Sequence, residues 1–150
     1  MSACETALSK AKVLHIDECE AFFVERKVIT VRITDSEIAE IKQNQERSLA
    51  VRLIHQKRIG SAKTSNLDEI NKVVEDALKS TSLVKPKNYW KSLPSNTKFM
   101  SLEKLYDQKL ADISGTQASD IAQSMINSAM HQKVTTISGS LNIVFEKIAS

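Results

Sequence analysis

The residues best able to do chemistry are few and far apart in this sequence of 150 residues. They are His15, His55 and His131, together with Cys4 and Cys19. A zinc site needs several such ligands close together, and helical zinc motifs place two of them four residues apart. Only His15 and Cys19 stand four residues apart, and they lie at the predicted junction between a helix and a strand rather than on one helix. We therefore assign no catalytic, cofactor-binding or metal-ligating residue, and we interpret both cysteines as ordinary buried or surface thiols.

Residues 52–70, with the sequence RLIHQKRIGSAKTSNLDEI, are the stretch most easily mistaken for a reactive site. They combine a histidine, a glycine, cations, hydroxyl groups and two acids. Alternating residues on both sides of HQKR predict the tip of a hairpin, with a solvent-exposed His55. Gly60 is expected where a strand bends or where another backbone passes close. The stretch is therefore interpreted as a pair of strands that leads into a helix.

The end of the same stretch carries the signals of a helix start. Ser65 or Asn66 can accept a hydrogen bond from a backbone N–H that the first helical turn leaves unpaired. Asp68 or Glu69 stands three residues on, as in a capping box, and both acids favour the positive end of a helix. These signals predict a helix over residues 66–80.

The cations Lys57, Arg58 and Lys63 leave two interpretations open. Charged side chains often protect an edge strand from pairing with other chains. The same side chains can form a basic edge that binds an anionic partner. The net charge of +3 is a mild excess of 21 basic over 18 acidic residues, and it does not favour nucleic acid.

The periodicity of the first half predicts the elements around these residues. Residues 2–14 show an apolar stripe at helical spacing, and Ser2 and Glu5 form a possible capping box at its start. Residues 19–63 change to the two-residue period of strands. We expect five short strands there, joined by polar turns as an antiparallel meander.

The middle of the chain breaks this pattern. Residues 83–101 have no period and hold both prolines, which predicts a linker or an arm that lies on the surface. Tyr89 and Trp90 are expected to pack there as anchors, and stacking on a ligand is the alternative for these two aromatic residues.

The last third returns to regular patterns. Residues 101–113 show a weak helical stripe, and residues 117–131 a clearer one, for which Thr116 is the expected cap. Residues 134–149 alternate as two strands, with Gly139 as a bend or bulge between them.

These patterns predict an α+β fold. An antiparallel β-meander sheet flanked by helices is expected first, followed by the helix and strands that begin a second, incomplete lobe. The expected division is a first domain over residues 1–82, a linker over 83–101 and the start of a middle domain over 102–150.

Composition excludes several classes of protein. The sequence is 41% hydrophobic and 26% charged, so it can bury a core. No apolar run approaches the length of a membrane helix, and the charged first residues lack the apolar centre of a signal peptide. Two cysteines without a shared motif favour a reducing compartment, so we expect a cytoplasmic protein.

The run from Cys19 to Leu78 resembles the N-terminal domain of the TldD/PmbA family, the so-called modulators of DNA gyrase. The features that carry the resemblance are ERKVITVRITDSEIAEI, SLAVRLI, RIGSAKTSNL and VVEDAL. Later segments, LYDQKLADI, IAQSMINSAMHQ and SLNIVFEKIAS, resemble the approach to the family's middle domain and its first helix and strand. The family often has a glycine in the hairpin turn where this chain has Gln56 and Lys57, which predicts a different turn type here.

The resemblance implies a functional context. Family members are zinc-dependent peptidases or their metal-free partners, and the metal motif, a His-Glu-x-x-x-His helix with a later Cys, lies in a C-terminal domain without counterpart here. The implied zinc therefore belongs to that missing part, and this chain is expected to hold no cofactor. Its N-terminal parts are implied to help build a homo- or hetero-oligomer with a TldD/PmbA-type subunit. The resemblance does not separate the peptidase subunit from its metal-free partner.

Three functional hypotheses remain. The first is the non-catalytic N-terminal part of a cytosolic TldD/PmbA-type metallopeptidase, inactive alone, whose complete form cleaves small or unfolded peptides. The second is a stand-alone interaction module that pairs with a full-length family member. The third is an unrelated domain that binds an anionic ligand or nucleic acid.

Overall fold

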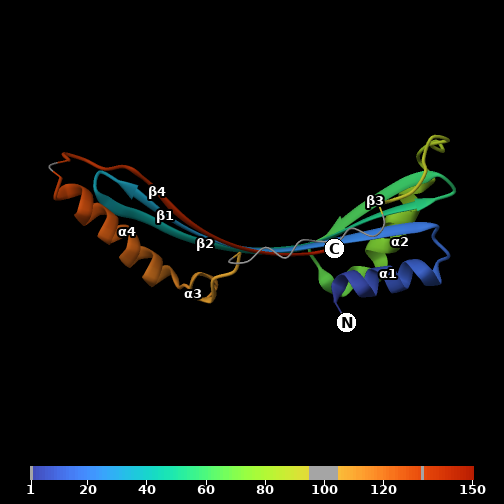
Figure 1. The fold of residues 1–150 in the computed structure, drawn as a ribbon, viewed down its shortest axis with the longest axis horizontal. Coiled ribbons are helices and arrows are strands. Elements are labelled where there is room, and N and C mark those ends of the chain that lie inside the picture. The colour runs from blue at the N-terminus through green and yellow to red at the C-terminus, as the bar shows by residue number, and fades with distance from the viewer. Residues whose placement is uncertain (1, 95–104, 133) are drawn as a thin grey trace. The chain divides into compact units, whose positions relative to one another are not determined.

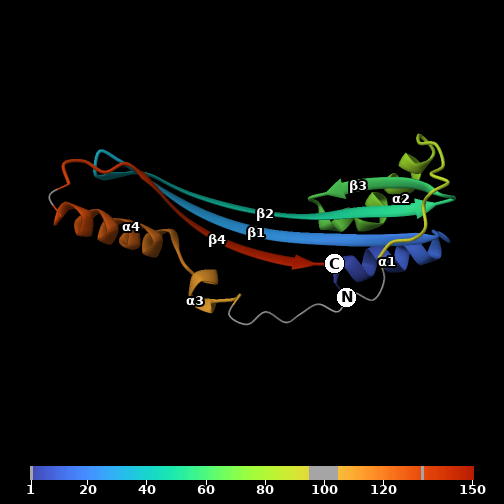
Figure 2. The same cartoon turned by 45° about the horizontal axis from the view of Figure 1, so that its top comes forward.

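The computed structural model of the protein describes residues 2–94, 105–132 and 134–150. Its strands form a four-stranded sheet with the order β3-β2-β1-β4, and helices accompany them (Figures 1 and 2). The predicted α+β class with an antiparallel sheet flanked by helices is confirmed. In chain order the elements are α1 (Ala3–Val13), β1 (Glu18–Thr34), β2 (Glu37–His55), β3 (Arg58–Thr64), a 3-10 turn (Leu67–Glu69), α2 (Ile70–Thr81), α3 (Gln108–Ala111), α4 (Gly115–Met130) and β4 (Gly139–Ala149).

The expectation of five short strands over residues 19–63 was wrong, because two of the three strands found there are long. β1 has 17 residues and β2 has 19. Neither strand contains Gly or Pro, so no residue forces the backbone out of the extended region. The sequence reading divided β2 into two strands at its polar middle. Polar residues that are exposed to solvent can nevertheless continue a strand, and the middle of β2 is exposed.

The strands are joined by tight turns with unusual backbone angles. Asp35 and Ser36, between β1 and β2, have φ of 51° and 65°. Gln56 and Lys57, between β2 and β3, have φ of 50° and 60°, and His55 pairs with Arg58 across them. Positive φ at both central residues is the pattern of a type I′ turn, which favours Asn-Gly. Gln56 and Lys57 thus adopt backbone angles that glycine favours, although neither is glycine. The prediction of a different turn type at these two residues was wrong.

Contacts divide the described residues into two compact units. The first unit holds residues 2–25, 46–94 and 147–150, and the second holds 26–45, 105–132 and 134–146. Strands β1, β2 and β4 each contribute residues to both units. The domain boundaries expected from the sequence stay a prediction.

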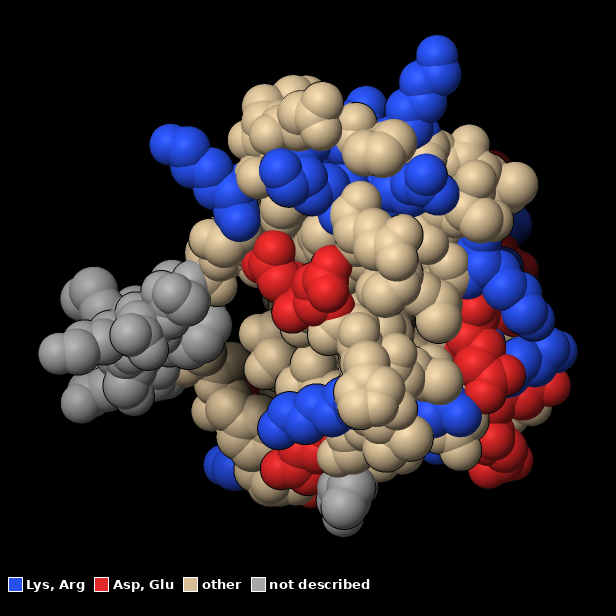
Figure 3. All heavy atoms as spheres, turned by 90° about the vertical axis from the view of Figure 1, so that its right-hand side faces the viewer, with Lys and Arg blue, Asp and Glu red and all other residues tan. Residues whose placement is uncertain are grey.

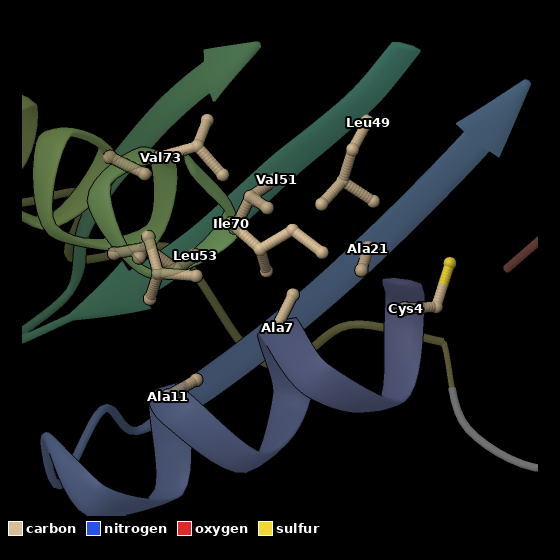
Figure 4. Packing of buried hydrophobic residues seen from close by; sticks show 11 residues of the cluster. Cys4, Ala7, Ala11, Ala21, Leu49, Val51, Leu53, Ile70 and Val73 are labelled. Atoms are coloured by element: carbon tan, nitrogen blue, oxygen red, sulfur yellow. The ribbon is translucent and has the colours of Figure 1, made fainter. Parts of the chain in front are cut away.

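In the first unit, α1 and α2 pack on one face of the sheet. Leu49, Val51 and Leu53 alternate along β2 and are fully buried, as their two-residue period predicts. Small residues of α1, Ala7 and Ala11, let that helix lie close to the strands (Figure 4). The cluster consists of Cys4, Ala7, Ala11, Ala21, Leu49, Val51, Leu53, Ile70, Val73, Val74 and Ala77.

Gly60 lies where α2 crosses β3, as the sequence predicted for a close backbone approach. A Cβ atom at Gly60 would stand 2.1 Å from the carbonyl oxygen of Ala77 and 2.6 Å from Oγ of Ser80. The neighbouring amide of Ser61 donates a hydrogen bond of 3.0 Å to that Ser80 oxygen. Glycine is therefore required here by space, since no side chain fits between the strand and the helix.

Helix starts in the first unit follow the predictions in part. Ser2 and Glu5 form the predicted capping box of α1, with Glu5 N donating to Ser2 Oγ at 3.2 Å and Ser2 N to Glu5 Oε2 at 2.7 Å. Asn66 accepts from the Asp68 amide at 3.1 Å, but Ser65 caps nothing and no capping box forms there. The chain enters α2 through a 3-10 turn, and so the helix begins later than predicted.

In the second unit, α4 packs against the sheet through alanines. Ile29, Val31 and Ile33 of β1 are buried, and Ala118 and Ala122 of α4 are completely buried with them. Ile113 and Ile126 complete this second core. Lys27 reaches the loop before α4, where its Nζ donates to the Ile113 carbonyl at 3.0 Å.

Three expectations for this unit were wrong. Ser114, not Thr116, caps α4. It forms a capping box with Gln117, three residues on in the sequence Ser-Gly-Thr-Gln. Residues 134–138 form no strand, because their polar groups bond to the β1–β2 turn instead: Ser36 N donates to the Ile137 carbonyl at 2.8 Å. Gly139 begins β4 rather than bending the chain between two strands.

α3 takes up only part of the weak helical stripe seen at residues 101–113, and residues 101–104 of that stripe lie outside the described residues.

Candidate functional site

The histidines do not come together. His15 lies exposed in the turn after α1, with φ of 53°, and His55 ends β2. His131 ends α4 in the other unit. Within residues 2–94, 105–132 and 134–150, no three His, Cys, Asp or Glu side chains gather as a metal site would need. The described residues therefore do not fit a zinc ion, and the absence of zinc from the chain stays a prediction.

His55 differs from its expected exposure. Its side chain is half-buried, and its Nδ1 atom is buried without a hydrogen-bond partner. The Nε atom of neighbouring Arg58 is buried in the same way. The sequence predicted a solvent-exposed His55 because it gives no sign that residues 84–94 contact the hairpin tip. In the structure Lys87 N donates to the carbonyl of Lys57, in the turn beside His55.

Neither cysteine is activated as a nucleophile. Burial raises the pKa of the Cys4 thiol, whose Sγ donates to the Ala149 carbonyl at 3.5 Å. Burial, with the charge of Glu20 beside it, raises the pKa of Cys19 to about 11. A thiol reacts as the thiolate, so both side chains are protonated and unreactive at neutral pH. The interpretation of both residues as ordinary thiols agrees with these environments.

The segment after α2 is tied to the hairpin by specific hydrogen bonds. Lys87 N donates to the Lys57 carbonyl at 2.7 Å. Trp90 Nε1 donates to one carboxylate oxygen of Glu18 at 2.9 Å, and Leu93 N donates to the other. Trp90 is therefore an anchor, as predicted, and its stacking on a ligand stays untested.

Tyr89 is not an anchor, since 77% of its surface is exposed. The expectation that it packs there as an anchor beside Trp90 was wrong.

The hydrogen bond from Lys87 to Lys57 brings the cations of the 84–94 segment close to those of the hairpin tip. Figure 3 shows Lys and Arg side chains gathered on the side of the molecule that includes this tip, with acidic side chains beside them. In the described part of the chain, none of these cations forms an ion pair, and the nearby acid Asp17 accepts from the Gln56 amide instead. The cations are Lys57, Arg58, Lys85, Lys87 and Lys91.

Lys63 is separate from this group, at the far end of β3. It lines a shallow groove of about 280 Å³ with Glu20 and Arg52, whose side chains form an ion pair of 2.8 Å. Arg58 and Lys63 thus stand at the two ends of the edge strand β3, as edge protection requires.

A broad, open hollow lies on the outward face of α4 in the second unit. It has a volume of about 810 Å³ and is mostly apolar. Sequence reasoning missed it because Ile121 and Met125 were assigned to the buried stripe of the helix. Ile121 and Met125 are in fact 41% and 50% exposed. Its lining residues are Asp120, Ile121, Ser124, Met125, Ser128, Ala129 and Gln132.

None of the helices in the described residues is long and apolar enough to cross a membrane.

One family model matches part of the chain. Residues 19–81 match the family model described as PmbA/TldA metallopeptidase domain 1. No curated protein is similar enough in sequence to match.

Solved structures of similar fold cover almost the whole chain. TldE from Thermococcus kodakarensis has a TM-score of 0.80 and 20% identity, and the match covers 99% of this chain and 34% of that one. A candidate modulator of DNA gyrase from Thermotoga maritima has a TM-score of 0.69 and 13% identity, over 97% and 38% of the two chains. A third, from Bacteroides thetaiotaomicron, has a TM-score of 0.70 and 17% identity, over 97% and 36%. The present chain therefore spans little more than a third of each of these proteins.

Proposed function

We propose that this chain, whose residues 19–81 match the PmbA/TldA metallopeptidase domain 1 model, is a non-catalytic, structural part of a PmbA/TldD-type peptidase assembly. In this role it builds contacts between subunits, and the cleavage of small or unfolded peptides belongs to the complete assembly. The proposal includes a cytoplasmic location, which rests on the two unpaired cysteines.

The observation that carries the proposal is the apolar surface of the second unit. Large hydrophobic side chains that are exposed among the described residues number fifteen, and nine of them lie in this unit. Exposed apolar side chains that gather, as Ile121 and Met125 do on α4, mark surfaces that bind other protein. A unit with this surface is therefore suited to be covered by protein. The nine are Ile41, Leu105, Tyr106, Leu110, Ile121, Met125, Met130, Val134 and Val144.

The described side chains also suit a structural rather than a chemical role. Both thiols are held in the protonated form by burial, and the acids Asp17 and Glu18 accept hydrogen bonds from the hairpin and from the 84–94 segment. These groups hold the first unit together.

Association with a complete family member tests the proposal. The purified chain is mixed with a complete PmbA/TldD protein, and the mass of the product is measured by light scattering after gel filtration. We expect a complex of the two chains. A Val144→Lys variant should weaken it, because Val144 is an exposed apolar residue on β4. Ser140→Lys adds the same charge to an exposed polar position of β4 and is the matched control. Two separate masses at every concentration would contradict the proposal.

A second candidate function is favoured by the five unpaired cations at the hairpin tip, with exposed Tyr89 between them in the sequence. Cations interleaved with aromatic residues can bind single-stranded nucleic acid or another anionic ligand. Such binding weakens steeply with salt. Fluorescence anisotropy with a labelled single-stranded oligonucleotide tests this candidate: binding that falls with salt and is lost in Lys57→Glu supports it, and no binding at low salt excludes it.

A further inference from the structure

The loop that follows α2 displays large apolar side chains to solvent. Residues 82–91 form this loop, the α2 loop. Leu83 is 86% exposed, Val84 39% and Tyr89 77%. Every residue from 82 to 89 is exposed, and Figures 1 and 2 show this stretch projecting from the first unit beyond the end of α2. Single exposed apolar residues are common on protein surfaces, whereas a group of them marks a surface that binds protein or membrane.

Hydrogen bonds fix the backbone of the α2 loop even though its side chains are exposed. Leu83 N donates to the Ser80 carbonyl at 3.2 Å and so extends the last turn of α2. Lys87 N donates to the Lys57 carbonyl at 2.7 Å, and Trp90 N donates to the Lys87 carbonyl at 2.9 Å. Because the loop is held in one shape, binding through it costs little ordering of the backbone.

Positive charge surrounds these apolar side chains. The α2 loop contains three lysines and no acidic residue. The hydrogen bond between Lys87 and Lys57 brings the cations of the hairpin tip close to them. The nearby carboxylates, Asp17 and Glu18, are fewer and already accept hydrogen bonds. The loop and the tip therefore keep an excess of positive charge, from five cations without an ion pair in the described part of the chain: Lys57, Arg58, Lys85, Lys87 and Lys91.

Aliphatic and cationic side chains in one loop favour a membrane surface over nucleic acid. Nucleic acid is bound by cations and by aromatic rings that stack on bases, and aliphatic side chains contribute little to it. A lipid bilayer takes all three kinds of side chain. Aliphatic side chains enter the boundary of the acyl chains, tyrosine lies among the headgroups, and lysine and arginine attract anionic headgroups.

We infer that the α2 loop and the hairpin tip bind the surface of a membrane that contains anionic lipid. Leu83 and Val84 are the side chains that enter the bilayer, and Tyr89 lies at the level of the headgroups. The five cations hold the surface by charge. A contact of this kind stays at the interface and needs no membrane-spanning helix. The inference goes beyond the proposed structural role, and it names a different partner for the cations of the second candidate function.

Sedimentation with lipid vesicles tests the inference. The purified chain is mixed with vesicles of phosphatidylcholine alone, or with vesicles that also contain phosphatidylserine, and the bound fraction is measured over a range of lipid concentrations. We expect binding to the anionic vesicles that falls as the salt concentration rises, and much weaker binding to the neutral ones.

The variant Leu83→Gln tests the apolar part of the contact. Removing a leucine that is buried in the bilayer should weaken binding to the anionic vesicles by about tenfold. Leu110→Gln makes the same change at an exposed position of the second unit, and it should leave binding unchanged.

The variant Lys87→Glu tests the charge. Each lysine near an anionic surface strengthens binding about fivefold, so reversing one charge should weaken binding by more than about tenfold. Lys42→Glu makes the same change of net charge on an exposed part of β2 in the second unit, and it is the matched control. Circular dichroism confirms that all four variants fold.

The fluorescence of Trp90 reports insertion directly. Trp90 is the only tryptophan of the chain and lies in the α2 loop, so the signal comes from this site alone. Phospholipid that carries bromine on its acyl chains should quench this fluorescence in the anionic vesicles, because the loop then lies against the acyl-chain boundary.

No binding to anionic vesicles at low salt, or binding that Leu83→Gln leaves unchanged, would overturn the inference. Equal losses in Leu110→Gln and Lys42→Glu would do so too, because the contact would then not be confined to the α2 loop and the hairpin tip. If the labelled oligonucleotide bound while the vesicles did not, the second candidate function would stand and the membrane contact would be overturned. The complex with a complete family protein is measured without lipid and decides the structural role by itself.

Discussion

Replacing Gly60 by alanine should strongly destabilise the first unit. The added Cβ would stand 2.1 Å from the Ala77 carbonyl oxygen, which is backbone, and 2.7 Å from Cγ2 of Thr81. A side chain could rotate away from the new methyl group, but a helix carbonyl cannot. α2 must therefore move off β3, and the hydrogen bond from Ser61 N to Ser80 Oγ is stretched.

The size of the effect follows from this geometry. Forcing one extra methyl group into a packed site typically costs 1 to 3 kcal/mol. Because the clash is with backbone, we expect about 3 kcal/mol, the upper end of that range. The α2 residues that cover the core beside Gly60, Val74 and Ala77, would lose part of their packing as well.

Urea unfolding followed by circular dichroism measures this free energy. Gly139→Ala is the matched control, because a Cβ there meets no atom within 4 Å, and its effect should stay within about 0.5 kcal/mol. If Gly60→Ala were as stable as Gly139→Ala, the close packing of α2 on β3 would be refuted.

Three further predictions concern single residues. Lys57→Gly should stabilise the chain by up to about 1 kcal/mol in urea, since φ of 60° strains any residue with a Cβ; a loss of stability would contradict the turn geometry. Ser114→Ala should cost about 1 kcal/mol by removing the α4 cap, and an unchanged midpoint would count against it. Cys19 should alkylate slowly at neutral pH in the native chain and faster as pH approaches 11, because its raised pKa delays thiolate formation; rapid labelling at neutral pH would refute this.

Local patterns in the sequence predicted the features that depend on neighbours along the chain. Alternation in SLAVRLI placed Leu49, Val51 and Leu53 on one buried face. The Ser2 and Glu5 spacing predicted a capping box, and Gly60 indicated a close backbone approach. The alternation and the capping box depend on residues a few positions apart, and Gly60 signals by its own lack of a side chain, so a single sequence contains these signals.

Features set by distant residues could not be predicted in this way. The hydrogen bond from Trp90 to Glu18 joins residues 72 positions apart, and the bond from Ser36 to Ile137 joins residues 101 apart. In neither pair does the sequence around one residue indicate that the other residue lies close to it. The absence of a strand at residues 134–138 follows from the second contact, which uses the polar groups that a strand would need.

The two faces of α4 show a different limit. Sequence periodicity found an apolar stripe, but it joined the inward Ala118 and Ala122 with the outward Ile121 and Met125, because all four side chains are apolar. Only the packing of Ala118 and Ala122 on the sheet separates the buried side from the exposed Ile121 and Met125. The sequence therefore assigned Ile121 and Met125, which lie on the exposed side of α4, to the buried core.

The most direct test of the central claim, that this chain contributes structure and not catalysis, is its metal content measured together with its peptidase activity. The purified 150-residue chain is dialysed, analysed for zinc, and incubated with unstructured peptides. A catalytic zinc needs three protein ligands within about 2.0–2.3 Å of the ion and an open position for water. We predict no stoichiometric zinc and no cleavage. One tightly held zinc per chain, with cleavage that a chelator abolishes, would contradict the account.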